Sequence, residues 1–216
     1  MTMLRNPTSF FPCSHAPTGT EELPRPGVLL VRHRNLKGPI RGFLSLREHP
    51  HIWVLDRFFR YSDCYEQYRS YTLSRRRGKK PKVFSLSAAV AAALVVPLLH
   101  CIRAVPVYRG SRSIEKTFQQ SISLLKQKKR LLIAADKSYD DESSPVTEIY
   151  TGFFRLESLY FEETGEHLPF FVLHFKKDGS MICSPPIFFH EKTPFRQQRR
   201  ELTNIVIQYL NGQFQS

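Results

Sequence analysis

The sequence predicts an α/β domain in which a mostly parallel, mixed sheet is flanked by helices. Two observations support this fold class. Short, uniformly apolar segments, typical of strands buried on both faces, alternate with longer segments that carry apolar residues at helical spacing. The 216 residues, 41% of them hydrophobic, are enough to bury one substantial core. Residues 1–23 lack the pattern and are expected to form a flexible N-terminal tail, and residues 24–212 a single domain.

Strands are expected wherever a short apolar run is bounded by turn residues. The clearest case is 28–31, four aliphatic residues that follow Gly27 and precede a polar turn. The pair Asp178–Gly179 marks a turn between the last two strands. The expected strands occupy residues 28–31, 52–55, 104–108, 131–135, 168–175 and 180–189.

Helices are expected between these strands because apolar residues recur on one face and capping residues stand at the ends. Asn35 is a suitable N-cap, and Pro39 is tolerated in a first helical turn. Thr193 followed by Pro194 begins the last helix, and Gly165 ends the one before the fifth strand. The expected helices occupy residues 35–47, 62–74, 113–129, 148–164 and 193–211.

A basic cluster is followed directly by an apolar segment. Residues 75–82 contain six cations, and residues 83–99 are apolar but short for a bilayer span. This junction favours a buried or interfacial helix next to an anionic membrane surface. A core helix preceded by a solvated basic loop is the equally weighted alternative. The residues expected to contact the membrane or an acyl chain are Arg75, Arg76, Arg77, Lys79, Lys80 and Phe84.

The charge balance indicates an anionic partner. The chain carries 32 Lys and Arg against 19 Asp and Glu, a net charge of +13. Such a chain attracts phosphorylated substrates, acidic carrier proteins, anionic lipid or nucleic acid. Its four cysteines are widely spaced, which argues against a zinc site or a disulfide scaffold and favours a reducing cytosol. No secretory pattern is present at the N-terminus, so a cytoplasmic location is expected.

Polar side chains follow three of the expected strands. His33 ends the first, Arg109 and Gly110 follow the third, and Asp136 and Lys137 follow the fourth. The carboxyl ends of parallel strands meet at one sheet edge, where ligands bind in α/β proteins. A base, a guanidinium for phosphate and a carboxylate–ammonium pair are therefore expected at one crevice. Taken singly, each of these residues also fits a solvated turn or a strand cap.

The order of elements resembles the glycerolipid acyltransferase family, which includes lysophospholipid acyltransferases, over about residues 26–211. The strand leading to His33 resembles the family's first motif, and residues 96–110, ending in Val107-Tyr108-Arg109-Gly110, resemble its second. Residues 132–138 stand at its third motif and residues 168–172 at its fourth. The family pairs its His with an Asp five positions later, where this chain has Gly38. Asp136 or Glu48 is therefore expected to orient His33.

The resemblance implies transfer of a fatty acyl group to a glycerol-phosphate or lysophospholipid hydroxyl. His33 takes the hydroxyl proton, and the alkoxide attacks an acyl thioester of coenzyme A or acyl carrier protein. Arg109, Gly110 and Lys137 hold the acceptor's phosphate. No bound cofactor or metal is implied, and the protein is expected to lie peripherally at the inner face of a membrane.

Two other functions stay open from the sequence. The first is a protein of the same fold that has lost the chemistry and binds anionic lipid or a membrane surface. The second is a nucleic-acid-binding protein. The net charge and the tyrosines before the basic cluster support this alternative. It ranks last because the cations adjoin a long apolar segment.

Overall fold

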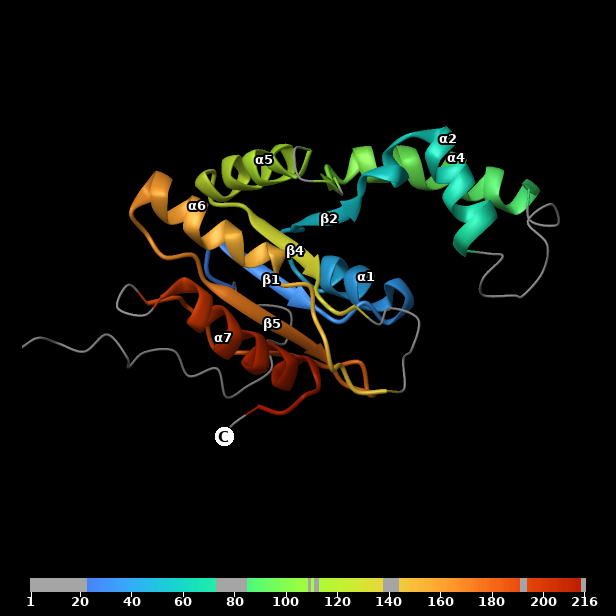
Figure 1. Ribbon diagram of the computed structural model, residues 1–216. Helices are drawn as coiled ribbons and strands as arrows, with labels where there is room; N and C mark the ends of the chain where they lie inside the picture. The colour runs from blue at the N-terminus through green and yellow to red at the C-terminus, as the bar shows by residue number, and fades with distance from the viewer. Residues whose placement is uncertain are drawn as a thin grey trace, which may run out of the picture.

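The computed structural model describes residues 23–72, 85–108, 110, 113–137, 144–190 and 194–214. Their centre is a six-stranded sheet with the order β3-β2-β4-β1-β5-β6 (Figure 1). All pairs are parallel except β5 with β6, so the predicted α/β class with a mostly parallel mixed sheet is confirmed. The strands are β1 Gly27–Val31, β2 His51–Leu55, β3 Val105–Val107, β4 Arg130–Ala134, β5 Phe170–Phe175 and β6 Met181–Cys183.

Strand β1 lies at the middle of the sheet. Its five residues are all buried, as the aliphatic run predicted. It pairs with β4 on one side and β5 on the other, and Val31 is in register with both Ala134 and Leu173. The residues that follow these three strands therefore emerge together at the carboxyl edge of the sheet.

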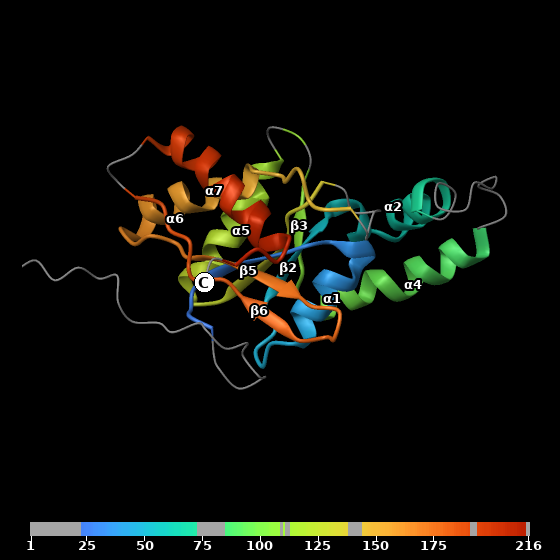
Figure 2. The same ribbon diagram turned by 90° about the horizontal axis from the view of Figure 1, so that it is seen from below.

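Helices cover both faces of the sheet. On one face, α5 Ile114–Lys126, α6 Arg155–Thr164 and α7 Phe195–Leu210 pack over alternate strand residues such as Val28 and Leu30. On the other, α1 Lys37–Leu44 and the turn after it pack over Leu29 and Val31. Figure 2 shows the three helices on one side of the strands and α1 on the other. This division follows from the side-chain alternation of a strand.

Helices α2 Tyr61–Glu66 and α4 Ser85–Cys101 pack against each other and extend away from the sheet (Figure 1). A 3₁₀ turn, η2 Asp56–Phe59, precedes α2, and a π-helical turn, η3 Gln67–Thr72, follows it. Only Ala88, Ala92 and Leu99 of α4 are buried, so α4 is not a core helix. In the part of the chain that is described, no helix combines the length and the apolarity needed to cross a membrane.

The segment before α6 differs from the prediction. Residues 148–151 were expected to be helical, but Ile149 forms an antiparallel bridge with Asp136, and the Tyr150 N–H donates to the Ala135 carbonyl at 2.8 Å. The helical part therefore begins with a 3₁₀ turn, η5 Gly152–Phe154, and continues as α6. Gly165 ends α6 at φ +72°, as predicted.

Several other elements are also shorter than expected, most clearly α1 and the last strand. A 3₁₀ turn, η1 Arg34–Leu36, precedes α1, which ends at Leu44 rather than near residue 47. The last strand was expected to reach residue 189, but β6 ends at Cys183. The prolines at 185 and 186 have no N–H for a ladder, and beyond them Ile187 makes only an isolated bridge with Phe170.

Candidate functional site

His33 and Asp136, the predicted catalytic residues, lie next to each other at the carboxyl edge. The backbone N–H of His33 donates to Oδ1 of Asp136 at 2.6 Å. The imidazole makes a different contact, in which Nδ1 accepts from the Leu36 N–H at 3.3 Å. The carboxylate therefore holds the main chain of His33, and the ring caps the turn that leads into α1.

This geometry determines which tautomer the neutral ring of His33 adopts. When Nδ1 accepts a hydrogen bond, the proton of a neutral imidazole is on Nε2. That nitrogen then donates, and it has no lone pair with which to take a proton from a hydroxyl. The observed arrangement thus suits a capping histidine better than a general base.

Asp136 is a buried carboxyl, with 2% of its surface exposed. Burial raises its pKa above 3.8, although the His33 N–H and the nearby charges of His33 and Arg32 oppose part of that rise. Within the described residues, its Oδ2 accepts no hydrogen bond. Asp136 is therefore a buried carboxyl whose pKa lies above its ordinary value, and not a solvated turn residue.

Gly38, five positions after His33, where the glycerolipid acyltransferase motif has an Asp, has no room for a side chain. An added Cβ would lie 1.6 Å from the carbonyl oxygen of Arg32. The same is true in milder form at Gly42, whose Cβ would lie 3.1 Å from Cδ1 of Leu132. Helix α1 thus lies directly on the end of β1 and on β4, and this close approach excludes a carboxylate at position 38.

Glu48, the other carboxylate expected to orient His33, lies at the opposite edge of the sheet. It forms an ion pair with Arg25, which precedes β1. Its backbone carbonyl accepts from Arg130, the first residue of β4. Glu48 therefore stands at the amino ends of the strands and cannot orient His33.

The other predicted phosphate-binding residues are dispersed. Lys137 forms an exposed ion pair with Glu148, with Nζ and Oε2 2.8 Å apart, which raises the pKa of Lys137 and lowers that of Glu148. Gly110 follows β3, which β2 and β4 separate from β1, about 14 Å at ordinary strand spacing. Outside the described residues lie Arg109 and the predicted membrane contacts Arg75, Arg76, Arg77, Lys79, Lys80 and Phe84.

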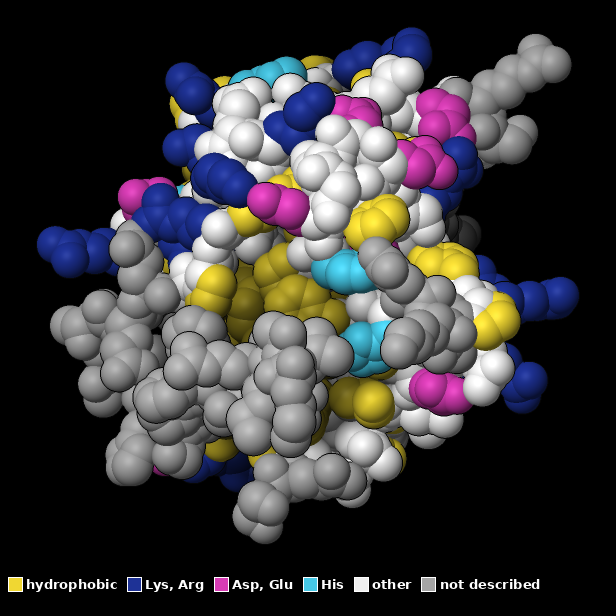
Figure 3. All heavy atoms as spheres, turned by 90° about the vertical axis from the view of Figure 1, so that its left-hand side faces the viewer, with side chains coloured by type: hydrophobic (Ala, Val, Ile, Leu, Met, Phe, Trp, Pro, Cys, Tyr) yellow, Lys and Arg dark blue, Asp and Glu magenta, His cyan; other side chains and the backbone are white. Residues whose placement is uncertain are grey.

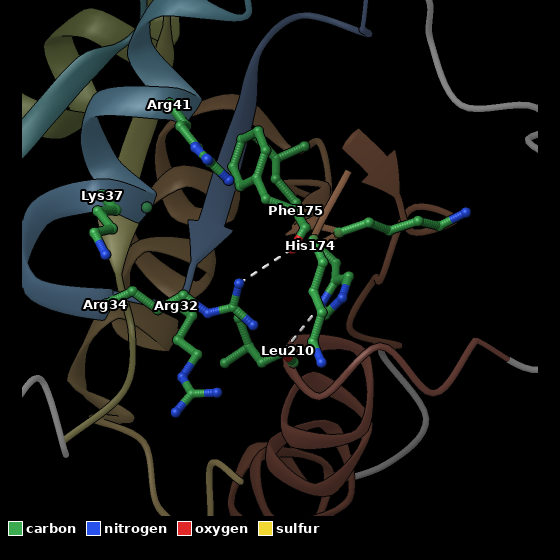
Figure 4. Close-up of a pocket in the computed structure, with 11 residues that line it drawn as sticks. Arg32, Arg34, Lys37, Arg41, His174, Phe175 and Leu210 are labelled. Carbon is green, nitrogen blue, oxygen red and sulfur yellow. Dashed lines mark hydrogen bonds between the residues drawn. The ribbon is translucent and has the colours of Figure 1, made fainter. Parts of the chain in front are cut away.

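A cationic pocket of about 220 Å³ opens between the ends of β1 and β5, the start of α1 and the end of α7 (Figure 4). The chain leaves β1 toward β2 and leaves β5 toward β6, so the two connections diverge and leave a crevice at the edge. No carboxylate lines this pocket among the described residues. Its charged and titratable lining consists of Arg32, Arg34, Lys37, Arg41, His174, Lys176 and Lys177.

Hydrogen bonds to backbone carbonyls fix two of the lining side chains. Nη1 of Arg34 donates to the Phe175 carbonyl at 3.1 Å, across the two strand ends. Nδ1 of His174 lies 3.1 Å from the Leu210 carbonyl, at the end of α7. Both contacts are visible in Figure 4. They hold a guanidinium and an imidazole at the pocket wall.

The pocket electrostatics favour an anion. Burial lowers the pKa of His174 below 6.5, and the positive charges of Arg34, Arg32 and Lys176 lower it further, against the Leu210 carbonyl. His174 is therefore neutral at pH 7, and six Lys and Arg supply the field. By contrast, the face seen in Figure 3 has Lys and Arg side chains scattered around its margin with Asp and Glu between them. The pocket is thus a local concentration of positive charge.

Sequence reasoning identified none of these pocket residues as binding residues. The available signal was the spacing of Arg32, Arg34, Lys37 and Arg41 around the first strand–helix turn. Lys176 and Lys177 follow the fifth strand in the same way. Joining the two groups required the knowledge that β5 pairs with β1.

Fold and pocket together define the protein as an α/β protein with a cationic pocket at the carboxyl edge of its sheet. No family model, curated protein or solved structure matches the chain. Among the described residues, no group of three or more His, Cys, Asp or Glu is placed to hold a metal ion.

Proposed function

We propose that this chain binds the phosphate group of a glycerol-phosphate or lysophospholipid-type ligand in the cationic pocket. In this proposal the protein is the non-catalytic alternative: an acyltransferase-like fold used for binding. The observation that carries it is the convergence of six Lys and Arg on one pocket that no described carboxylate lines.

The energetics of the pocket support a phosphate ligand. Two unit charges 4 Å apart interact by about 4 kcal/mol at an effective dielectric constant of 20, so gathering like charges opposes folding unless an anion relieves it. Arg32, Arg34 and Arg41 carry planar forks that can each bind two oxygens of a phosphate. The volume of about 220 Å³ is below the roughly 300–1,000 Å³ of pockets that enclose a whole drug-sized ligand. It suits a head group, and an acyl chain would have to lie outside.

Titration calorimetry with sn-glycerol 3-phosphate, and with glycerol as the uncharged comparison, tests the proposal. We expect binding of the phosphate ester alone, weakened as ionic strength rises. The double variant Lys37→Gln/Arg41→Gln removes two pocket charges and is expected to lower affinity at least tenfold. The matched control, Lys116→Gln/Lys129→Gln, removes two charges elsewhere and is expected to change affinity less than twofold. Equal effects of the two double variants would show that net charge, and not the pocket, binds the anion.

Acyl transfer is the second candidate, and one observation favours it. Asp136 is buried beside His33, and its Oδ2 accepts no hydrogen bond from any described residue, so a shift of the His33 ring would let the carboxylate orient the imidazole. His33 would then take the proton of a glycerol-phosphate hydroxyl, the alkoxide would attack an acyl thioester, and the thiol would leave with the proton. An assay with labelled acyl-coenzyme A and acyl carrier protein, run on wild type and His33→Ala, decides this point. Product that is formed by wild type and lost in His33→Ala supports catalysis. If no acceptor gives product, acyl transfer is ruled out and the binding function is retained.

A further inference from the structure

Helix α1 presents a mixed cationic and apolar face to solvent. Its inner face consists of Gly38, Pro39 and Gly42, which are buried against the sheet. The outer positions follow the i, i+3, i+4, i+7 spacing of a single helix face. They are Lys37, Ile40, Arg41 and Leu44.

The apolar side chains on this face are unusually exposed. Ile40 has 54% of its surface exposed and Leu44 has 67%, and Leu36, at the start of the helix, has 49%. Lys37 and Arg41 on the same face line the cationic pocket, whereas these three apolar residues do not. On this helix, the cations that line the pocket are therefore less than one turn away from exposed apolar side chains.

The surrounding charge selects the partner of this face. From Gly27 to Arg47 the chain contains five Lys or Arg and no Asp or Glu. A surface that is both apolar and uniformly cationic complements the interface of an anionic bilayer, where apolar side chains enter the head-group region and cations meet lipid phosphates. A protein partner would have to present carboxylates to the same cations. No feature of α1 favours such a protein surface over lipid phosphates.

We propose that α1 docks on the surface of an anionic phospholipid bilayer, so that the pocket receives its phosphate-bearing ligand from the membrane. This inference rests on the proposed function and adds the source of the ligand. Ile40 and Leu44 insert at the bilayer surface, and Lys37 and Arg41 face the head groups at the mouth of the pocket.

Helix α4 supplies the comparison surface. It exposes a larger apolar stripe, whose members Leu86, Val90, Leu94 and Leu98 have exposed fractions of 79%, 52%, 66% and 56%. Its sequence from Ser85 to Cys101 has no Lys, Arg, Asp or Glu. Helix α4 thus exposes apolar side chains and carries no charge along its own length. The described cations Arg57, Arg60, Arg69 and Arg103 belong to the segments that pack against it or follow it.

Vesicle co-sedimentation with matched variants tests the proposal. Vesicles of phosphatidylcholine with one-fifth phosphatidic acid are compared with pure phosphatidylcholine vesicles. We expect wild type to prefer the anionic vesicles at least tenfold, and Ile40→Gln/Leu44→Gln to lose at least ten-fold in affinity for them. The control Leu86→Gln/Leu94→Gln is expected to lose less than twofold. Thermal unfolding verifies that both double variants, which change only exposed side chains, are folded.

The outcomes separate this inference from the proposed function. Calorimetry with sn-glycerol 3-phosphate is repeated on the α1 variant, whose affinity is expected to stay within twofold of wild type because Ile40 and Leu44 lie outside the pocket. Binding of glycerol 3-phosphate without binding of anionic vesicles overturns the docking proposal and leaves the proposed function intact. Vesicle binding through α1 without glycerol 3-phosphate binding supports the docking face and overturns the proposed function. Equal losses in the α1 and α4 variants overturn the assignment to α1.

Discussion

The backbone N–H of His33 donates to Oδ1 of Asp136 at 2.6 Å, which joins the residues that follow the two central strands β1 and β4. His33 stands between Arg32 and Arg34, both of which line the cationic pocket. The buried carboxylate of Asp136 fixes the main chain at this point, and it therefore positions the backbone from which the Arg32 and Arg34 side chains project. Asp136 thus stabilises the pocket through the backbone of His33, although it is not one of the lining residues.

Replacing Asp136 tests this support. Asp136→Ala leaves the partly buried His33 N–H without its acceptor, which costs about 2 kcal/mol of unfolding free energy. Asp136→Asn keeps an acceptor oxygen and is expected to cost much less. Urea unfolding, followed by fluorescence of the single tryptophan Trp53, measures both. Equal losses in the two variants would mean that the hydrogen bond is not what Asp136 contributes.

The pH dependence of the same pair of proteins has a definite sign. Because the folded state raises the pKa of Asp136 above 3.8, the fold favours the protonated carboxyl. As pH rises from 3.8 to the folded-state pKa, ionisation of Asp136 therefore lowers the unfolding free energy. Above the folded-state pKa this loss stays constant. The unfolding free energy of Asp136→Asn minus that of wild type should rise from pH 4 toward neutral pH and then level off. Carboxyls with lowered pKa values, such as Glu48 and Asp178, occur in both proteins and cancel in this difference.

The elements that sequence predicted well are those whose pattern is local. The buried strand β1 was predicted from four consecutive aliphatic residues, and the apolar stripe of α5, with buried Phe118, Ile122 and Leu125, from its helical spacing. Residues 148–151 were predicted wrongly, because their backbone groups bond to residues 135 and 137, and such pairing leaves no local trace. Pairing across the sheet overrode a plausible helical pattern there.

The candidate site was predictable only as far as single strand ends. The contact between His33 and Asp136 followed from placing two parallel strand ends at one edge. The pocket could not be predicted in this way, because Lys176 and Arg34 line the same pocket only as a result of the pairing of β5 with β1. Strand order is a property of the whole sheet, and without it the cations at 32–41 and 176–177 were two separate surface groups.

Substitution of Gly38 tests the close approach of α1 to β1. Gly38→Ala places a Cβ 1.6 Å from the Arg32 carbonyl oxygen, a backbone atom that cannot rotate away. We expect a loss of about 3 kcal/mol of unfolding free energy, the upper range for overpacking. The control is Gly152→Ala, where an added Cβ meets no atom within 4 Å. It is expected to raise stability by about 0.5 kcal/mol through the unfolded state. Similar midpoints for the two variants would contradict the packing described.

Anion binding should become tighter as pH falls, and His174 should be the cause. In the free protein, burial and the nearby cations lower the pKa of His174 below 6.5, so the ring is neutral at pH 7. An anion in the pocket favours the imidazolium and raises that pKa. Binding therefore takes up a proton and gains about tenfold in affinity at low pH for each pKa unit of the rise.

Sulfate is the suitable probe for this effect, because it keeps both charges between pH 5.5 and 7.5. Calorimetry should give a severalfold higher affinity at the lower pH for wild type. Protonation of Asp136, whose pKa is also raised and which lies near Arg32, works in the same direction. The decisive quantity is therefore the difference between wild type and His174→Gln, since the variant keeps Asp136 and loses the imidazole. Equal pH slopes in the two proteins would assign the effect to other groups and remove His174 from the site. A flatter slope in the variant would place the proton on His174, at the pocket wall between β5 and α7.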